Sequence, residues 1–546
     1  MAGGIQANGH HPSDPRMINS HIQLSGNIFY NISSLFSSTV PIFVTYIQYS
    51  ESSHNDIYLA PYSGICHGYG WGSNDAGGSL TYINRGLYNY QPLYTTPTTS
   101  MSNLIQGNLI HAYGLSHTDL GATYTLGKSP GTLLTENYAF NSSWFGFYTD
   151  EGSNTYTATS NDYLSNGDWF APNQGNGANT ANNTLIDNFG HVGADEVNMP
   201  NQTGFYNDTF VRNYGVTGLG ETNEEGHRVA YRAGISPGNR GSRPVSNPPT
   251  PDTYLSLELP GTFDNGKVKL RIPNFDDKAF TNMSFAASAT NGYALRGLSL
   301  PQRVPAGGAK VASWRLNGSG CALPTVTISL TYTNVRTGVV NTISISGTAP
   351  GNALPQSGFL SSSSWAASFG QCNSTLGIRT GGRDIVSPYD DWASIYQASA
   401  IGSTGNVTAE VLSLDPADPL SKAGVVIRQS LTANGTTTNL AKGYAVVVVT
   451  PSNGVLFHWD GNGDGYLDSN YIISGVTAPV SLRLAVQEYI YTAYYSKDNG
   501  TAWNLIGAAV NGTRSANSTT LDAGVLVDSH AGFNNATGIF EGLSFQ

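Results

Sequence analysis

Lys422-Ala423-Gly424-Val425-Val426-Ile427-Arg428 is the first landmark of the stretch that decides the fold, Ser361 to Gln546. Outward from it, the runs Val449 to Val455 and Gly538 to Phe545 also combine apolar residues with polar ones, as strands packed on a core do. Lys497-Asp498-Asn499-Gly500 has residues that adopt positive φ in a hairpin turn. We therefore predict one complete β-sandwich in this part of the chain.

Composition extends the β prediction to the whole chain. Only 11% of the 546 residues are charged, and Gly, Ser, Thr, Asn and Tyr are abundant, which favours short strands and long turns over amphipathic helices. The length allows several cores. A net charge of -11 argues against nucleic acid or anionic membranes as partners. The longest apolar run near the N-terminus is too short to span a bilayer, so we expect no membrane span.

Two linkers rich in Gly, Pro and Ser divide the chain, at 236–251 and 348–364. We predict a β-rich N-terminal region over 1–235, a small β-sandwich over 252–348 and the C-terminal sandwich over 361–546. In the middle region, Tyr254 to Leu259 with Lys267 to Ile272, and Val326 to Tyr332 with Val339 to Ile345, are predicted hairpins. The predicted fold class is mainly β and multi-domain.

The N-terminal region is less clear. Ile42 to Ile47 suits either a strand or a buried helix. Short alternating runs between Gly121 and Phe170 predict antiparallel sheet. No charged segment followed by an apolar one opens the chain, so we expect a truncated or processed N-terminus, in which case 1–235 is part of a larger catalytic domain.

Acidic residues are densest between 171 and 235. Pairs of carboxylates carry out glycoside hydrolysis, one as a proton donor and the other supporting the developing cation or activating water. A solvated, turn-rich face is the alternative interpretation. The candidate catalytic residues are His191, Asp195, Glu196, Glu221, Glu224, Glu225 and His227.

The segment His191-Val192-Gly193-Ala194-Asp195-Glu196 resembles the His-x-Gly-x-Asp-Glu motif of the β-hexosaminidases. The resemblance implies that Glu196 is a general acid and that Asp195 orients a substrate acetamide, at the end of a barrel strand. It covers about seven residues, and the flanking sequence lacks the regular α/β alternation of such a barrel.

Aromatic residues near glycines and acids suggest sugar binding, because a flat aromatic ring and the apolar face of a sugar exclude water from each other. His67 and Trp71 lie in a Gly-rich segment, and Trp144 and Trp169 lie near Asp150, Glu151 and Asp168. Packing in a loop or a core is the alternative for each. The candidate substrate-binding residues are His67, Trp71, Trp144 and Trp169.

The C-terminal sandwich resembles the laminin-G-like, concanavalin-A-type jelly rolls of secreted carbohydrate-active proteins. The resemblance rests on Asn406 to Val411, Ala423 to Arg428 and Tyr494 to Trp503. It implies a module that binds glycan or spaces an enzyme. A charge in an apolar strand must be paired, so we expect Arg428 to bind a buried carboxylate such as Asp390 or Asp391 rather than a ligand.

Asp460-Gly461-Asn462-Gly463-Asp464-Gly465-Tyr466-Leu467-Asp468 has oxygen side chains at alternate positions of a Gly-rich loop, like the first half of an EF-hand calcium loop. Tyr471 occupies the position of the bidentate Glu of an EF-hand. The loop is therefore either a weak calcium site or a turn that binds no metal. The predicted ligands of a structural calcium ion are Asp460, Asn462, Asp464 and Asp468. No organic cofactor is expected.

Three cysteines are too few for a disulfide framework, and one bridge, Cys321 to Cys372, is possible. Fourteen Asn-x-Ser/Thr sequons favour secretion only weakly, because about ten are expected by chance. The sequence thus predicts a secreted, glycan-binding protein that is a glycoside hydrolase or part of one. The alternatives are a non-enzymatic adhesin or lectin-like surface protein and, less favoured, a β-hexosaminidase-like enzyme.

Overall fold

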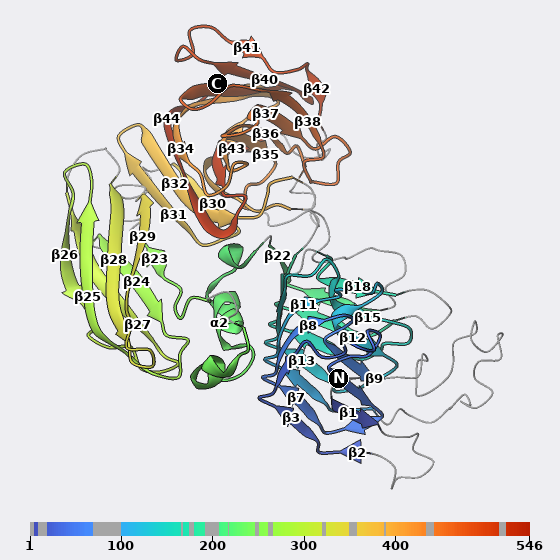
Figure 1. Cartoon of the computed structure of the whole chain (residues 1–546). Helices are drawn as coiled ribbons and strands as arrows, with labels where there is room; N and C mark the ends of the chain where they lie inside the picture. Colours follow the sequence, from blue (N-terminus) through green and yellow to red (C-terminus); the bar gives the residue numbers. More distant parts are fainter. Residues whose placement is uncertain are drawn as a thin grey trace, which may run out of the picture. The chain divides into compact units, whose positions relative to one another are not determined.

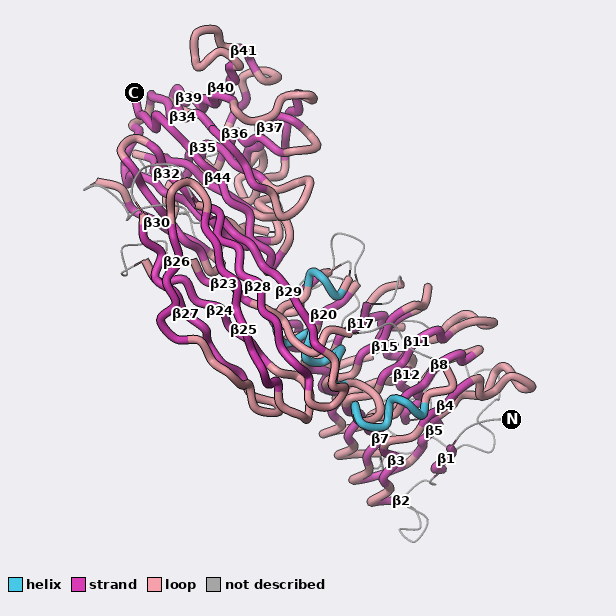
Figure 2. The backbone as a smooth tube through the Cα atoms, turned by 60° about the vertical axis from the view of Figure 1, so that its left-hand side comes forward, coloured by secondary structure: helices cyan, strands magenta, loops and turns pink. Residues whose placement is uncertain are grey.

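The computed structural model describes residues 5–8, 19–68, 100–164, 167–173, 180–191, 207–216, 218–245, 250–259, 266–318, 324–348, 358–386, 389–432, 442–512 and 520–546. Its contacts divide the chain into two compact units. Unit 1 holds Met1–Tyr254 with Pro273–Ala279 and Pro305–Gly308, and unit 2 holds the remainder. Strands dominate both units, as predicted (Figure 2).

Unit 1 is a parallel β-helix, in which successive coils each add one strand to each of three parallel sheets (Figure 1). The described strands of the first sheet are β1 (Ile5–Asn8), β5 (Ile42–Thr45), β9 (Ile65–Gly68), β12 (Gly121–Leu126), β15 (Phe145–Thr149) and β18 (Phe170–Pro172). Those of the second are β3 (Gln23–Ser25), β7 (Glu51–Ser53), β10 (Leu104–Gln106), β13 (Leu133–Thr135), β16 (Thr157–Thr159), β19 (Thr184–Ile186) and β21 (Thr209–Val211). Those of the third are β4 (Ile28–Tyr30), β8 (Asp56–Ala60), β11 (Leu109–Tyr113), β14 (Tyr138–Phe140), β17 (Asp162–Leu164), β20 (Phe189–Gly190) and β22 (Tyr214–Gly215), and β2 (Asn19–Ser20) pairs separately with β6 (Ile47–Gln48).

The prediction of antiparallel sheet between Gly121 and Phe170 was wrong. β12 pairs in parallel with β15, and β15 with β18, so the sheet neighbours of each strand lie one coil away along the chain. Alternation of apolar and polar residues shows that a strand has one buried face, but it does not report the direction of the neighbouring strand. The segment that suited either a strand or a helix is strand β5.

Rows of mainly apolar side chains fill the interior of the β-helix. In the second sheet, residues in register on neighbouring coils form the row Leu24, Ser52, Ile105, Leu134, Ala158, Leu185 and Phe210. In the third sheet, the corresponding row begins Phe29, Ile57, Ile110, Ala139 and Tyr163. Because each coil contributes little core by itself, the coils are stable only when stacked.

A ladder of asparagines, all buried except the partly exposed Asn27, marks the turn between the second and third sheets. Its rungs are Asn27, Asn55, Asn108, Asn137, Asn161, Asn188 and Asn213, and each Nδ2 donates to the Oδ1 of the next rung at 2.9 Å. The residue before every rung has a positive φ, between 51° and 70°. The side chains thereby satisfy backbone groups of this left-handed turn, which the sheets cannot reach.

A short helical segment follows the last described coil: η2 (Leu219–Glu221), α2 (Glu224–Arg232) and η3 (Pro237–Ser242). Asn223 caps α2 by accepting from the N–H groups of Glu225 and Gly226. α2 contacts β17, on the outer face of the third sheet. Among the described residues, no helix is long and apolar enough to cross a membrane.

Unit 2 contains two antiparallel sandwiches, each with its own core. In the described residues, the middle sandwich has one sheet of β23 (Ser256–Glu258), β24 (Lys267–Pro273), β27 (Ala309–Asn317) and β26 (Ala294–Ser299), and another of β25 (Phe280–Ala289), β28 (Thr325–Asn334) and β29 (Val340–Thr348). β23 pairs with β24, and β28 with β29, so the strand pairs of both predicted hairpins are confirmed.

The C-terminal sandwich packs two larger antiparallel sheets face to face. One orders its described strands β30 (Leu360–Ser363), β33 (Ala393–Ile401), β43 (Leu521–Asp528), β35 (Lys422–Arg428), β36 (Ala445–Thr450), β37 (Gly454–Trp459) and β38 (Ser469–Ile473). The other orders β31 (Ala367–Cys372), β32 (Thr375–Gly382), β44 (Gly532–Phe545), β34 (Thr404–Asp415), β39 (Val480–Gln487), β40 (Ile490–Ser496) and β41 (Asn504–Leu505), with β42 (Val510–Asn511) beside β40.

β35 is buried along its whole length because both faces of its sheet are covered. Val425 and Ile427 face the core between the sheets, whereas Val426 belongs to a second cluster with Trp392 and Tyr444 on the opposite face. Arg428 ends this strand and is fully buried. Its guanidinium donates to both carboxylate oxygens of Asp390, at 3.2 and 2.9 Å, which confirms the predicted pairing.

Cys372 is disulfide-bonded, and Cys66 is a free thiol. Cys321, the predicted partner of Cys372, lies outside the described residues. Burial of the Cys66 thiol raises its pKa to about 12, so this cysteine is not activated as a nucleophile.

Candidate active site

The candidate site lies on the outer face of the first sheet of the β-helix. Tyr124 on β12 and Tyr148 on β15 are in register, and their rings stack with centroids 5.0 Å apart. Thr125 and Thr149, the next residues along each strand, are buried and face inward, so the two tyrosines face outward. Tyr62 meets Tyr124 edge to face, with centroids 6.2 Å apart.

Two carboxylates meet at these tyrosines. The Tyr148 hydroxyl donates to Asp119 Oδ1 at 2.6 Å and lies 3.5 Å from Asp150 Oδ1. Tyr124 also donates to Asp150, and Asn173 Nδ2 donates to Asp150 Oδ1 at 2.6 Å. Since a single phenol oxygen reaches both acids, the two carboxylates form a close pair.

The two acids have different surroundings. Asp150 is buried, and this burial raises its pKa above the ordinary value; the hydrogen bond from Tyr124 opposes the rise, while the nearby Asp119 adds to it. Asp119 is exposed to solvent and lies on the segment before β12. Burial and the neighbouring acids also raise the pKa of both tyrosines, so their hydroxyls remain protonated donors.

The arrangement therefore supplies a carboxyl group that holds its proton to a higher pH beside a solvent-accessible carboxylate. A carboxyl group whose pKa is raised is suited to general acid catalysis. The Tyr148 ring is only 4% exposed because Tyr124 and Phe145 cover it, so the partly exposed Tyr124 is the ring of this stack that reaches the surface beside the pair.

The structure does not bring all the predicted catalytic residues together. Glu224 and Glu225 begin α2, Glu221 ends η2, and His191 follows β20. Arg228 forms ion pairs with Glu225 and, at 2.6 Å, with Glu136. Asp195 and Glu196 lie outside the described residues. His191 continues a coil of the β-helix rather than an α/β barrel, so the barrel that the β-hexosaminidase resemblance implies is absent around it.

His227 is buried on the same helix as Glu224 and Glu225. Its ring lies against Tyr254, with centroids 4.6 Å apart, and burial lowers its pKa to about 4. With its pKa lowered in this way, the His227 imidazole is neutral at neutral pH.

α2 covers another acid, Asp162 at the start of β17. It is fully buried, and burial together with the nearby Glu225 raises its pKa well above the ordinary value, although Arg228 opposes this. Neither carboxylate oxygen of Asp162 has a hydrogen-bond partner among the described residues, which suits a protonated acid.

Two of the predicted sugar-binding aromatics, His67 and Trp169, are buried in the β-helix. His67 is in register with Val44 and Thr125 inside the β-helix, and its burial lowers its pKa to about 4. Trp169 is 1% exposed, and its ring occupies the space where a side chain at Gly190 would lie. Trp144 is half-buried and packs against the same core. His67 and Trp169 are therefore not accessible to a sugar, whereas Trp144 remains partly exposed. Trp71 lies outside the described residues.

The predicted calcium loop folds as a network of turns. The Asp460 carboxylate accepts the N–H groups of Gly463 and Gly465, and Asp464 Oδ1 accepts that of Tyr466. Each oxygen keeps a lone pair, so these bonds are compatible with a cation. Tyr471 packs on Trp459 and offers no bidentate carboxylate. Among the described residues, no three His, Cys, Asp or Glu side chains converge to hold a metal ion.

Calcium binding stays a prediction, with weak affinity because so few charged ligands converge. At calcium concentrations well above the dissociation constant, we expect the thermal midpoint of unit 2 to rise by about 2 °C or more. Calorimetry of the full chain with and without calcium measures this, and Asp464→Ala should remove the shift. An identical shift in the variant, or none in the unmodified chain, would contradict the prediction.

Sequence reasoning placed Asp150 beside aromatic residues but did not select it, and it missed Asp119 altogether. The available signal was periodicity. Tyr124 and Tyr148 are one coil apart, and the asparagine rungs recur after 24 to 29 residues, except for the interval of 53 between Asn55 and Asn108. A repeat search at that period predicts a solenoid, which places such residues in one row.

No protein-family model matches the chain, and no curated protein matches it. Several similar solved structures are glycoside hydrolases, at low similarity. One titled "Glycoside hydrolase" is 22% identical over 43% of this chain and 31% of its own, with a TM-score of 0.28. A xylan beta-1,4-xylosidase from Bacillus halodurans is 12% identical over 54% of this chain and 64% of its own, with a TM-score of 0.23. A functionally unknown protein from Saccharomyces cerevisiae is 13% identical over 35% of this chain and 96% of its own, with a TM-score of 0.27. The chain thus matches about a third of the first structure, and TM-scores this low carry no argument about fold or activity.

Proposed function

We propose that the chain is a secreted glycoside hydrolase whose active site is the acid pair Asp119 and Asp150. The supporting observation is that one hydroxyl, that of Tyr148, reaches both carboxylates on an aromatic outer face of the β-helix. Asp150, with its raised pKa, donates the proton to the glycosidic oxygen. Asp119 supports the cation that develops as the bond breaks.

The separation of the acids favours retention of anomeric configuration. The Tyr148 hydroxyl oxygen lies 2.6 Å from Asp119 Oδ1 and 3.5 Å from Asp150 Oδ1. The distance between these two carboxylate oxygens therefore cannot exceed the sum of the two distances. This limit lies below the separation of about 6.5 to 9.5 Å that leaves room for a water in inverting enzymes. Asp119 is then the nucleophile, and Asp150 activates the water that releases the sugar.

The C-terminal sandwich serves in this proposal as a laminin-G-like, concanavalin-A-type glycan-binding module. Its two facing antiparallel sheets and the Arg428–Asp390 pair are consistent with that resemblance. The disulfide at Cys372 supports an oxidising, extracellular location.

Asp150→Asn and Asp119→Asn should each lower kcat/KM on a glycan substrate by about 10³-fold, because each removes one half of the acid–base chemistry. Turnover on a panel of polysaccharides, including xylans and pectins, measures this. The matched control is Asp168→Asn, an exposed aspartate on the next coil, which should leave turnover within about twofold.

The pH profile provides a second readout. Hydrolysis needs Asp150 protonated, so kcat/KM should fall as pH rises through the pKa of this residue, and Asp150→Asn should remove that alkaline limb. Unchanged turnover in both variants, with loss of turnover after Glu221→Gln, Glu224→Gln and Glu225→Gln, would instead favour the acids near α2. A chain that binds glycans of the panel but hydrolyses none would favour the adhesin or lectin-like alternative.

A further inference from the structure

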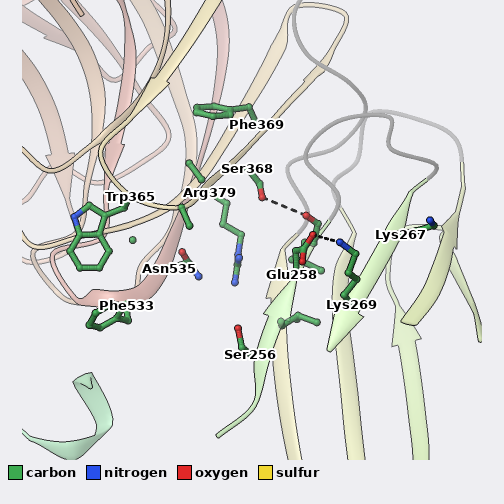
Figure 3. Close-up of a pocket in the computed structure, with 15 residues that line it drawn as sticks. Ser256, Glu258, Lys267, Lys269, Trp365, Ser368, Phe369, Arg379, Phe533 and Asn535 are labelled. Carbon is green, nitrogen blue, oxygen red and sulfur yellow. Dashed lines mark hydrogen bonds and ion pairs between the residues drawn. The ribbon is translucent and has the colours of Figure 1, made fainter. Parts of the chain in front are cut away.

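A cavity of about 620 Å³ lies within unit 2, between strands of the middle and C-terminal sandwiches. β23 and β24 supply one wall, and β31, β32 and β44 with the adjoining residues supply the other (Figure 3). Its size is in the range of about 300 to 1,000 Å³ that is typical of small-ligand sites. The acid pair of the β-helix is not among its lining residues.

Arg379 on β32 is the central feature of this cavity. Its side chain extends between the pair Trp365 and Phe533 and the strand that carries Glu258 (Figure 3). In the described part of the chain, the Arg379 side chain has no hydrogen bond and no ion pair. Burial lowers its pKa, and Asp415 opposes this from beyond ion-pair distance. A half-buried guanidinium without a bound carboxylate has donors available for an anion.

The backbone leaves room for this guanidinium. A side chain at Gly347 on β29 would lie 3.2 Å from Arg379 Nη2 and 3.0 Å from Leu259. Lys269 on the opposite wall is neutralised by Glu258, at 2.7 Å, whereas Lys267 has no ion pair among the described residues. The cavity therefore has a surplus of positive charge, in contrast to the net charge of -11 of the chain.

Aromatic and polar groups surround the charge. Trp365 and Phe533 meet edge to face, with centroids 5.0 Å apart, and Phe369 also lines the cavity. Asn535, Ser256 and Ser368 add hydrogen-bonding groups. A ligand that matches this lining has an apolar ring face, hydroxyls around the rim of the ring and one carboxylate.

We infer that this cavity binds a uronic acid residue of an acidic polysaccharide. The sugar carboxylate accepts two hydrogen bonds from Arg379, the ring lies against Trp365 and Phe533, and Asn535 and the serines bind hydroxyls. The site is a binding site distinct from the proposed hydrolytic pair. An acidic peptide also offers a carboxylate, but it would leave the aromatic wall and the hydroxyl-binding groups unmatched.

Titration calorimetry of the full chain tests the inference, with tetrasaccharides of galacturonic acid and of glucuronic acid as probes. We expect at least one to bind with a Kd of about 1 mM or tighter, and its carboxyl-reduced, neutral form to bind at least about 10-fold more weakly. Arg379→Met should weaken uronate binding by at least about 10-fold. Arg315→Met on β27, an exposed arginine outside the cavity, is the matched control and should leave binding unchanged.

A second variant guards against misfolding of Arg379→Met. Lys267→Met changes an exposed side chain, and it should weaken uronate binding by about 2- to 5-fold without changing the thermal midpoint. Absence of uronate binding up to about 10 mM, equal binding of the reduced sugar, unchanged binding in both variants, or tighter binding of a tetraglutamate peptide would each overturn the inference. Asp150→Asn should bind uronate normally, so failure of the hydrolase proposal and failure of this one are distinguishable.

Discussion

Asp390→Ala is expected to lower the free energy of unfolding of the C-terminal sandwich by about 3 to 5 kcal/mol. Asp390 binds the fully buried guanidinium of Arg428 through both carboxylate oxygens and also accepts Trp392 Nε1–H at 2.8 Å. Alanine would leave a positive charge in an apolar cluster with no counterion. The Tyr444 ring lies 4.6 Å from the guanidinium but cannot replace the carboxylate. A buried cation–π contact contributes about 2 kcal/mol, which is less than the expected loss.

Denaturant unfolding of the full chain, followed by tryptophan fluorescence and by calorimetry, measures this loss. The exposed pair of Glu258 and Lys269 provides the comparison, and Glu258→Ala should change stability by less than about 1 kcal/mol. Replacing both partners, Arg428→Met with Asp390→Leu, should restore most of the stability, because no buried charge then remains unpaired. A small effect of Asp390→Ala would mean that Arg428 finds another partner or water.

The Arg428–Asp390 pair was predictable because its cause is local. A charge within a run of apolar residues needs a carboxylate, and two acids at Asp390 and Asp391 precede a strand of the same sandwich. In the structure, Asp390 pairs with Arg428, and Asp391 Oδ2 pairs with Arg383 Nε at 2.6 Å. The hairpin strands of the middle sandwich were also predictable from local sequence. Their apolar and polar residues alternate in two runs that are close in the chain, and such a pattern predicts two paired strands.

The β-helix was not predicted because its order is non-local. Each coil has strands of only a few residues, and each strand pairs with strands that lie one coil away along the chain. The sequence therefore left sugar binding and packing both open for His67 and Trp169, and only the coil geometry shows that both are buried. Asp119 lies outside any strand, so no periodicity selected it, and only the folded coils bring it to Tyr148.

The asparagine ladder is the non-local feature with the largest expected effect on unit 1. Asn161, near its middle, donates to Asn188 Oδ1 at 2.9 Å and to the carbonyl of Leu134 at 3.0 Å, and it accepts from the backbone and side chain of Asn137. Asn161→Ala should lower the free energy of unfolding of unit 1 by about 3 kcal/mol or more. The reason is that several buried donors and acceptors lose their partners at once, and each such loss costs about 1 to 3 kcal/mol.

Urea unfolding combined with hydrogen exchange of the coil amides measures the effect of Asn161→Ala. Exchange should accelerate most at the amide of Asn137, whose N–H bonds directly to the Asn161 side chain. Gln23→Ala, which removes an exposed amide side chain from β3, is the control and should stay within about 0.5 kcal/mol. Asn161→Asp should be at least as destabilising as Asn161→Ala at neutral pH, because the buried carboxylate still accepts from Asn137 but faces the carbonyl of Leu134 and Asn188 Oδ1, to which it cannot donate. Equal stability of Asn161→Ala and Gln23→Ala would show that coil stacking, not the ladder, holds the turns of the β-helix in place.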